Sequence, residues 1–312
     1  MAPRFWHRPP GALMRLIGPL ARGTRPEPTQ PLRLPVPVIA VGSLSLGGTG
    51  KTPAVIAIAQ RLVMQGKAVH VITRGTGAPM RVDEQAHSPA EIGDEPLLIA
   101  AFAPCWLGRD WGETARAAIA AGAEILLFDG GVPDPIAEGQ ISVLVEDAVQ
   151  GFGNGFAWPL GPLKRKLIPG LAQADLLIAI GHEAACTRFR DQWHASLPCP
   201  LATGQLLPLP TGMDWDGLDV VAFAGINTPE RFFATLRGLG ANLIRAQALT
   251  DHQELTPALM TRLSREAQMA GAQLVTTEKD AVRLPRAFRE NVISLPVRLE
   301  LGDWAPLDAL FA

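Results

Sequence analysis

The stretch SLSLGGTGKTP, residues 43–53, constrains the fold more than any other part of this 312-residue chain. It follows the apolar run VPVIAVG and precedes TPAVIAIAQRLVMQG, in which apolar residues recur at helical spacing. The usual phosphate loop reads G-x-x-x-x-G-K-[ST], and Ser45 stands here in place of its first glycine. Phosphate is held mainly by inward-turned backbone N–H groups, so the three glycines before Lys51 still predict a strand, a phosphate loop and a helix.

Each position of this loop has an expected role. The glycines let the backbone approach a triphosphate closely, Lys51 would bridge the β- and γ-phosphates of ATP, and the Thr52 hydroxyl would bind Mg²⁺. The alternative is that a glycine-rich turn merely connects a strand to a helix tightly. The predicted nucleotide-binding residues are Gly47, Gly48, Thr49, Gly50, Lys51 and Thr52.

An acidic residue follows another apolar run further along the chain. AEILLFDGG carries Asp129 where a strand is expected to end, which suits a second Mg²⁺ ligand beside Thr52. The alternative is that Asp129 caps a turn or a helix.

The composition excludes several classes of partner and site. Hydrophobic residues make up 47% of the chain and charged residues 19%, which fits packed globular cores. The formal net charge of −2 provides no broad basic field, so we expect no nucleic-acid partner. The three cysteines lack C-x-x-C spacing and are expected to be reduced packing residues.

The N-terminal segment, residues 5–22, interleaves aromatic and aliphatic residues with histidine and arginines. Such a basic amphipathic segment can lie on an anionic membrane surface. The alternatives are that it packs on the body of the protein or is a frayed end. Arg15 and Pro19 interrupt its apolar stretch, so it is not read as a cleavable signal peptide, and no run elsewhere reaches the ~18 to 20 apolar residues of a membrane span.

Strand-like and helix-like segments alternate after a proline-dense connector, which predicts parallel sheets covered on both faces. The expected fold is α/β, with two α/β/α sandwich domains of which the first resembles a P-loop NTPase. The predicted ranges are 1–37 for the amphipathic segment and connector, 38–186 for the P-loop domain, 187–216 for a short β linker, and 217–312 for a smaller α/β domain.

A set of motifs between residues 35 and 285 resembles the tetraacyldisaccharide 4′-kinase family, the lipid A 4′-kinases. These motifs are VPVIAVGSLSLGGTGKTP, TRGTG, GDEPLLIA, GFGNGFAWPLGPL, FAGINTPERFFATLRGLGANL, DHQELT and VTTEKDAVRL, in that order. The resemblance implies phosphorylation of the 4′-hydroxyl of an acylated glucosamine disaccharide with ATP and Mg²⁺. It also implies two domains joined by a two-stranded linker, and peripheral docking of residues 5–22 on the cytoplasmic face of the bacterial inner membrane.

The resemblance assigns roles to four further residues. Asp94 of GDEP resembles the family's general base, assisted by His252 of the DH motif, and Glu95 and Arg74 are expected at the substrate or nucleotide phosphates. Taken without the family, Asp94 is equally an N-cap and His252 a surface histidine. The acidic and basic residues of TTEKD are equally a capping cluster at a strand end.

The chain departs from the family at several positions. The family pattern D-D-G-[LF]-Q is replaced by Asp129, Gly130, Gly131, Val132 and Pro133; Ser43 replaces an asparagine, and the chain has no tyrosine. The loss of the second aspartate favours an alternative hypothesis, a catalytically impaired paralogue that binds nucleotide as a regulatory module; Asp134 is a candidate replacement.

A soluble ATPase of the partitioning type is disfavoured by Leu46, where that class carries a lysine. The sequence leaves the oligomeric state open.

Overall fold

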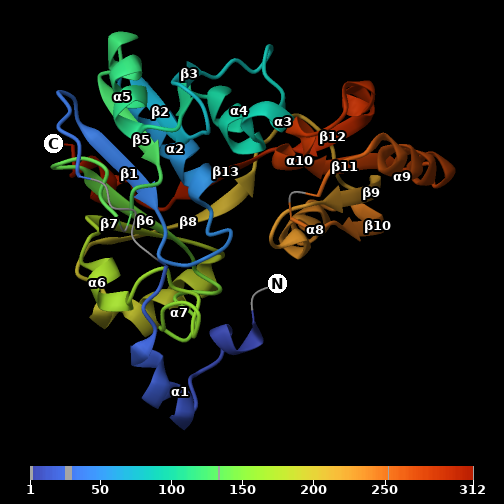
Figure 1. Ribbon diagram of the computed structural model, residues 1–312. Coiled ribbons are helices and arrows are strands. Elements are labelled where there is room, and N and C mark those ends of the chain that lie inside the picture. Colours follow the sequence, from blue (N-terminus) through green and yellow to red (C-terminus); the bar gives the residue numbers. More distant parts are fainter. Residues whose placement is uncertain (1–2, 25–29, 133, 252, 312) are drawn as a thin grey trace. The chain divides into compact units, whose positions relative to one another are not determined.

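The computed structural model describes residues 3–24, 30–132, 134–251 and 253–311. The chain divides into two compact units. Unit 1 comprises residues 1–84, 99–206 and 299–312, and unit 2 comprises residues 85–98 and 207–298. Each unit has its own sheet (Figure 1).

Unit 1 is built on a nine-stranded sheet in the order β13-β8-β7-β6-β1-β5-β2-β4-β3. The pairs along the row from β8 to β4 are parallel, and β3 pairs with β4 in antiparallel fashion. The strands are β1 (Val38–Gly42), β2 (Val69–Arg74), β3 (Met80–Arg81), β4 (Cys105–Gly108), β5 (Ile125–Asp129), β6 (Ile141–Asp147), β7 (Leu176–Ile180), β8 (Leu201–Pro208) and β13 (Val297–Leu301).

Helices cover this sheet because its central strands are apolar on both faces. Val38 and Ala40 of β1 join a buried cluster that includes side chains of α5 (Trp111–Ala120) and α7 (Glu183–Trp193). Ile39 and Val41 face the other way, since side chains alternate along a strand, and α2 (Lys51–Met64) packs against β1, β2 and β5 without joining that cluster. The result is the predicted α/β/α sandwich.

The remaining elements of unit 1 lie at its periphery. The N-terminal segment forms two short 3₁₀ turns around a six-residue helix, and no helix among the described residues is long and apolar enough to cross a membrane. These elements are η1 (Arg4–His7), α1 (Ala12–Ile17), η2 (Gly18–Leu20), α6 (Leu167–Leu171), η3 (His194–Ser196) and α11 (Ala305–Asp308).

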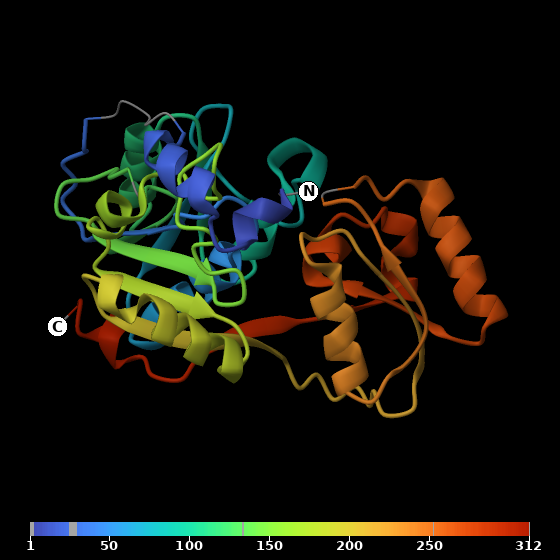
Figure 2. The same ribbon diagram turned by 90° about the horizontal axis from the view of Figure 1, so that it is seen from below.

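Unit 2 contains a four-stranded parallel sheet in the order β10-β9-β11-β12. Alternate side chains of β9 pack on α8 on one face and on α9 on the other, and Figure 2 shows these two helices on opposite sides of the strands. The elements are α3 (Pro89–Ile92), α4 (Asp94–Ala100), β9 (Asp219–Ala224), α8 (Pro229–Gly238), β10 (Asn242–Ala248), α9 (Pro257–Met269), β11 (Gln273–Thr277), α10 (Glu278–Val282), η4 (Arg286–Asn291) and β12 (Val292–Leu295).

Two segments are grouped differently by these units and by the predicted domain ranges. Residues 85–98, which precede most of the first sheet in sequence, belong to unit 2, and residues 299–312 belong to unit 1. The sequence does not predict β3 and β4 individually, because β3 has two residues and β4 has four. The strand β8 lies within residues 187–216, the range of the predicted β linker.

In both units the chain reverses its winding direction beside the first strand. β1 has β5 and β6 as neighbours, and β9 has β10 and β11. In open α/β sheets, ligands bind outside the carboxyl ends of the strands at such a switch point. The two switch points are therefore where functional groups are expected, one in each unit.

Candidate active site: a phosphate loop and a buried carboxylate network

Residues 43–50 join the carboxyl end of β1 to the N-terminus of α2 in unit 1. Gly47 and Gly50 have φ angles of 107° and 93°, a region that glycine adopts without strain. A Cβ atom on Gly50 would lie 2.8 Å from Cδ1 of Ile180, so this position excludes a side chain on two grounds. The backbone thus favours glycine at two of the three predicted positions, Gly47 and Gly50.

The loop contains backbone N–H groups for which the described residues provide no hydrogen-bond acceptor. Within those residues, no backbone or side-chain acceptor receives the N–H groups of residues 47–50, and the buried Oγ1 of Thr49 has no hydrogen-bond partner. Lys51 and Thr52 are half-buried in the first turn of the 14-residue helix α2. Open N–H groups at a helix N-terminus, followed by an ammonium group, form an anion site.

A fully buried carboxylate supports the base of the loop. One oxygen of Glu146, Oε1, accepts hydrogen bonds from the backbone N–H groups of Leu44 at 2.6 Å and Ser45 at 3.1 Å. Burial raises the pKa of Glu146 from 4.5 to about 7, against the lowering effect of these hydrogen bonds and of Lys164. The loop conformation therefore depends on a side chain of β6, which the motif analysis did not identify.

The segment that carries Lys164 lines the other side of the loop base. Leu46 donates its N–H to the Pro162 carbonyl and Lys164 donates its own to the Leu44 carbonyl, at 2.8 and 2.7 Å. The Lys164 ammonium donates to Ser43 Oγ at 3.1 Å. Its pKa is lowered to about 8, first by burial and then by the charge of Lys51. The GFGNGFAWPLGPL motif thus packs against the phosphate loop.

Asp129 ends β5, directly beside Val41 of β1. Its charge also helps to keep the pKa of Lys164 from falling further. A strand-end carboxylate in unit 1, together with the Thr52 hydroxyl, is the oxygen donor set that Mg²⁺ accepts alongside phosphate oxygens and water. The role of these two residues as metal ligands stays a prediction. Among the described residues, no group of three or more acidic, histidine or cysteine side chains forms a separate metal cluster.

Gly130, at the position of the missing second aspartate, and Gly131 both have positive φ angles. Gly130 has a φ angle of 136° and donates its N–H to the Val41 carbonyl, and Gly131 has a φ of 85° with Ile136 where a Cβ would lie. Asp134, the candidate replacement, forms an ion pair with Arg165 at 2.6 Å. Pro133 lies outside the described residues. Gly130 thus has a backbone conformation that an aspartate at this position would rarely adopt.

Arg74 ends β2 with its guanidinium 5.1 Å from the centre of the Trp111 ring. This cation–π contact orients an exposed cation at the carboxyl edge of the sheet. A phosphate-binding role for Arg74 stays a prediction.

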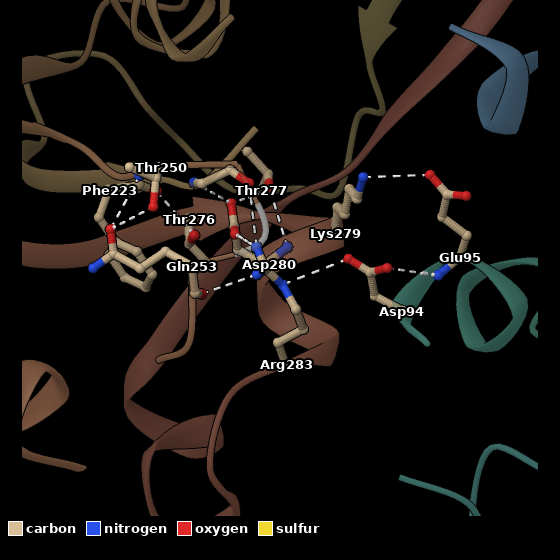
Figure 3. A network of polar contacts seen from close by, with 11 residues as sticks. Asp94, Glu95, Phe223, Thr250, Gln253, Thr276, Thr277, Lys279, Asp280 and Arg283 are labelled. Carbon is tan, nitrogen blue, oxygen red and sulfur yellow. Dashed lines mark hydrogen bonds and ion pairs between the residues drawn. The ribbon is translucent and has the colours of Figure 1, made fainter. Parts of the chain in front are cut away.

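In unit 2, Asp94 begins α4 and is 6% exposed. Its Oδ1 accepts the N–H of Glu95 at 3.1 Å, and its Oδ2 lies 3.5 Å from Nε of Arg283 (Figure 3). Glu95 forms an ion pair with Lys279 at 3.3 Å. His252, the other predicted member of the acid–base pair, lies outside the described residues.

The TTEKD motif caps a helix at the end of a strand, which is the alternative that the sequence left open: Thr277 is the N-cap of α10. It also contributes to a buried polar network. The Thr277 hydroxyl accepts the N–H of Asp280 and donates to the Asp280 carboxylate, at 3.1 and 2.7 Å. Asp280 is fully buried, accepts the N–H of Gly225 at 3.0 Å and forms an ion pair with Arg283. Sequence reasoning missed Arg283, although it stands in the quoted motif, because its partners come from distant segments.

Comparison with known proteins assigns the chain to a family. The family model for tetraacyldisaccharide-1-P 4′-kinase matches residues 5–312. The tetraacyldisaccharide 4′-kinases of Jannaschia sp. (strain CCS1) and Dinoroseobacter shibae are 51% and 49% identical to this chain, over 99% of it and 97% of each relative. A crystal structure of LpxK from Aquifex aeolicus in complex with ATP, 23% identical, has the same fold with a TM-score of 0.71 and covers 91% of this chain and 90% of that one. This chain therefore belongs to the tetraacyldisaccharide 4′-kinase family.

Proposed function

We propose that this protein transfers the γ-phosphoryl group of ATP to the 4′-hydroxyl of a tetraacylated glucosamine disaccharide 1-phosphate, a step of lipid A biosynthesis. The observation that carries the proposal is the phosphate loop, with its open amides at 47–50 and with Lys51 and Thr52 in the next turn, in a chain of this family. Nucleotide binding by the loop follows from geometry, and the acceptor follows from the family.

The reaction forms a bond between the sugar oxygen and the γ-phosphorus and breaks the bond from that phosphorus to the β,γ-bridging oxygen. The loop amides and Lys51 stabilise charge on the β- and γ-phosphates, and ADP leaves with the bonding electron pair. Thr52 and Asp129 would hold Mg²⁺, which would further neutralise the charge on these phosphates.

The hydroxyl proton needs an acceptor, and Asp94 is the proposed one. Its carboxylate is buried and held by the Glu95 N–H and by Arg283, so it is ordered before substrate binds. We propose that His252 assists Asp94, and that Arg74 and Glu95 contact phosphate groups of the nucleotide or the lipid.

A transfer assay tests this proposal directly. Purified protein is incubated with radiolabelled ATP, Mg²⁺ and tetraacyl disaccharide 1-phosphate in detergent. We expect label in the lipid, loss of transfer in Lys51→Ala, a sharp fall in Asp94→Asn, and wild-type transfer in Lys67→Ala, a control at an exposed lysine after α2. ATP binding without any transfer by the wild type would instead favour the impaired paralogue suggested by Gly130.

We also propose that residues 5–22 dock the protein peripherally on the cytoplasmic face of the inner membrane. Two features of the segment support this proposal: Trp6 is buried and donates to the Pro159 carbonyl at 3.1 Å, which attaches the segment to the body of unit 1, and other apolar side chains face solvent among exposed arginines. The exposed apolar residues are Phe5 at 44%, Leu16 at 76% and Leu20 at 76%, with Arg8, Arg15 and Arg22 exposed beside them.

Sedimentation with vesicles that contain anionic lipid tests this docking. Leu16→Glu and Leu20→Glu should reduce the bound fraction, because each places a carboxylate against acyl chains and anionic headgroups. Met269→Glu is the matched control, since Met269 is 83% exposed on α9 of unit 2. Equal loss in all three variants, or in none, would contradict docking through this segment.

A further inference from the structure

Arg283 is the centre of the polar network in unit 2, and its side chain is only 12% exposed. Its guanidinium pairs with the Asp280 carboxylate and donates to the carbonyls of Gln253 at 3.0 Å and Gly225 at 3.3 Å. Its Nε lies 3.5 Å from Oδ2 of Asp94 (Figure 3). Four segments that are far apart in the sequence therefore meet on one planar group.

These segments converge at the switch point of the unit 2 sheet. Gly225 follows β9, Gln253 follows β10, and Asp280 and Arg283 follow β11. The carboxyl ends of parallel strands share one edge, which explains how three loops reach the same group. Asp94 alone comes from elsewhere, on the 85–98 segment that joins unit 2.

The charges show that Asp94 is an additional partner. Asp280, which accepts hydrogen bonds from Thr277 and Gly225, already pairs with Arg283, so the Asp94 carboxylate is a second buried acid beside the same guanidinium. Arg283 therefore does not need Asp94 for its own neutralisation.

We propose that Arg283 is a positioning residue for phosphoryl transfer: it fixes the carboxylate of Asp94 and the main chain at Gln253, the residue that follows His252. This inference rests on the proposed function, in which Asp94 accepts the hydroxyl proton. The guanidinium donates a directed hydrogen bond to the Gln253 carbonyl and contacts Asp94 as an ion pair, since within the described residues neither Nε of Arg283 nor Oδ2 of Asp94 makes a hydrogen bond. A lysine at this position would supply one point charge without the planar geometry that reaches both groups.

The test compares Arg283→Ala, Arg283→Lys and Asp94→Asn, singly and as the double variant Arg283→Ala/Asp94→Asn. Misplacing a catalytic group by about an ångström can cost about 100-fold in rate, so we expect kcat of Arg283→Ala to fall by about that factor. Because the phosphate loop belongs to unit 1, the Kd for ATP should stay within about twofold. Arg283→Lys should be intermediate, and millimolar guanidinium should restore transfer to Arg283→Ala by about tenfold.

The double variant separates positioning from a general loss of structure. If Arg283 acts through Asp94, removing it from the Asp94→Asn protein should lower kcat by less than about threefold, because the effects of coupled residues are not additive. Arg286→Ala is the matched control, since Arg286 is exposed in the following 3₁₀ turn. Circular dichroism and thermal unfolding identify variants that fail to fold, and for these Arg283→Lys carries the test.

Several outcomes overturn the inference. One is a folded Arg283→Ala with kcat within twofold of wild type; another is a full 100-fold further loss in the Asp94→Asn background; a third is a rise in the Kd for ATP that accounts for the whole defect. Wild-type protein that transfers no phosphoryl group would contradict the proposed function itself, which is a different result from transfer that is indifferent to Arg283.

Discussion

The phosphate loop of unit 1 and the Asp94–Arg283 network of unit 2 occupy the same kind of place in two parallel sheets, yet they are built from different material. The loop offers main-chain N–H groups, shaped by Gly47 and Gly50, with few side chains. The network consists of buried charges that satisfy one another. A site made of main-chain groups tolerates a replacement such as serine at position 45, where the usual motif has glycine. A site made of side chains depends on the identity of each charged residue.

The largest effect that this contrast predicts is on the stability of unit 2. Asp280→Ala should lower the free energy of unfolding of unit 2 by about 3 to 5 kcal/mol, because the Gly225 N–H loses its buried acceptor and Arg283 loses its closer carboxylate and keeps the longer contact with Asp94. Glu290→Ala, at an exposed glutamate of the same unit, is the control and should change stability by less than about 0.5 kcal/mol. Denaturant unfolding measures the free energy of unfolding of both variants. Equal losses would contradict the view that the network is more sensitive to substitution than the surface of the same unit.

The second effect concerns Glu146, the buried acid that accepts hydrogen bonds from two N–H groups at the base of the loop. The folded-state pKa of Glu146 is raised from 4.5 to about 7, so the stability that its protonated form provides is present below pH 4.5 and is lost as pH rises towards 7. Lys164, with a pKa lowered to about 8, is the neighbouring charge, itself beside Lys51, Asp129 and Arg165.

Glu146→Gln keeps an acceptor for the two amides and cannot ionise. Measured by denaturant unfolding, the stability of wild type relative to this variant should fall by on the order of 3 kcal/mol between pH 4.5 and 7. A flat difference across that range would mean that Glu146 titrates normally, and the loop base would then resemble the rest of the backbone-built site.

The third effect sharpens the role of the loop glycines. Gly50→Ala introduces left-handed strain of about 1 to 2 kcal/mol and a contact with Ile180, and should weaken ATP binding about tenfold or more. Gly66→Ala has a similar φ of 80° at the end of α2 with open space around it, so it should reduce stability without changing the Kd for ATP. Titration calorimetry on both variants distinguishes loop geometry from strain alone.

The smallest effect concerns Gly130. Replacing it by aspartate restores the second acid of the family pattern, but its φ of 136° lies outside the small left-handed region open to other residues. We expect Gly130→Asp to reduce stability by about 1 to 3 kcal/mol and to leave kcat unimproved. Gly139→Asp, at a φ of 67° with open space, is the control. A gain in kcat would show that the missing carboxylate alone limits this chain.

The two regions also differ in how far the sequence predicts them. The loop, its strand and its helix follow from one contiguous motif, because their contacts are local. Arg283 and Glu146 could not be recognised in this way, since each binds groups more than 50 residues away. The sequence also does not predict that residues 85–98 belong to unit 2, for the same reason. The local pattern indicates a helix at Asp94, the start of α4, but it does not indicate which unit the segment packs with.

The path of the chain through unit 1 has a consequence for biosynthesis. Its nine-stranded sheet ends in β13, and Asp308 of α11 pairs with Arg61 of α2 at 2.6 Å, so the segment 299–311 completes a body begun nearly 300 residues earlier. Unit 2 therefore consists of two segments inserted into unit 1, residues 85–98 and 207–298, and both are synthesised before residues 299–312 complete unit 1. The unit that carries the phosphate loop is the last to be completed, although residues 43–53 are translated early.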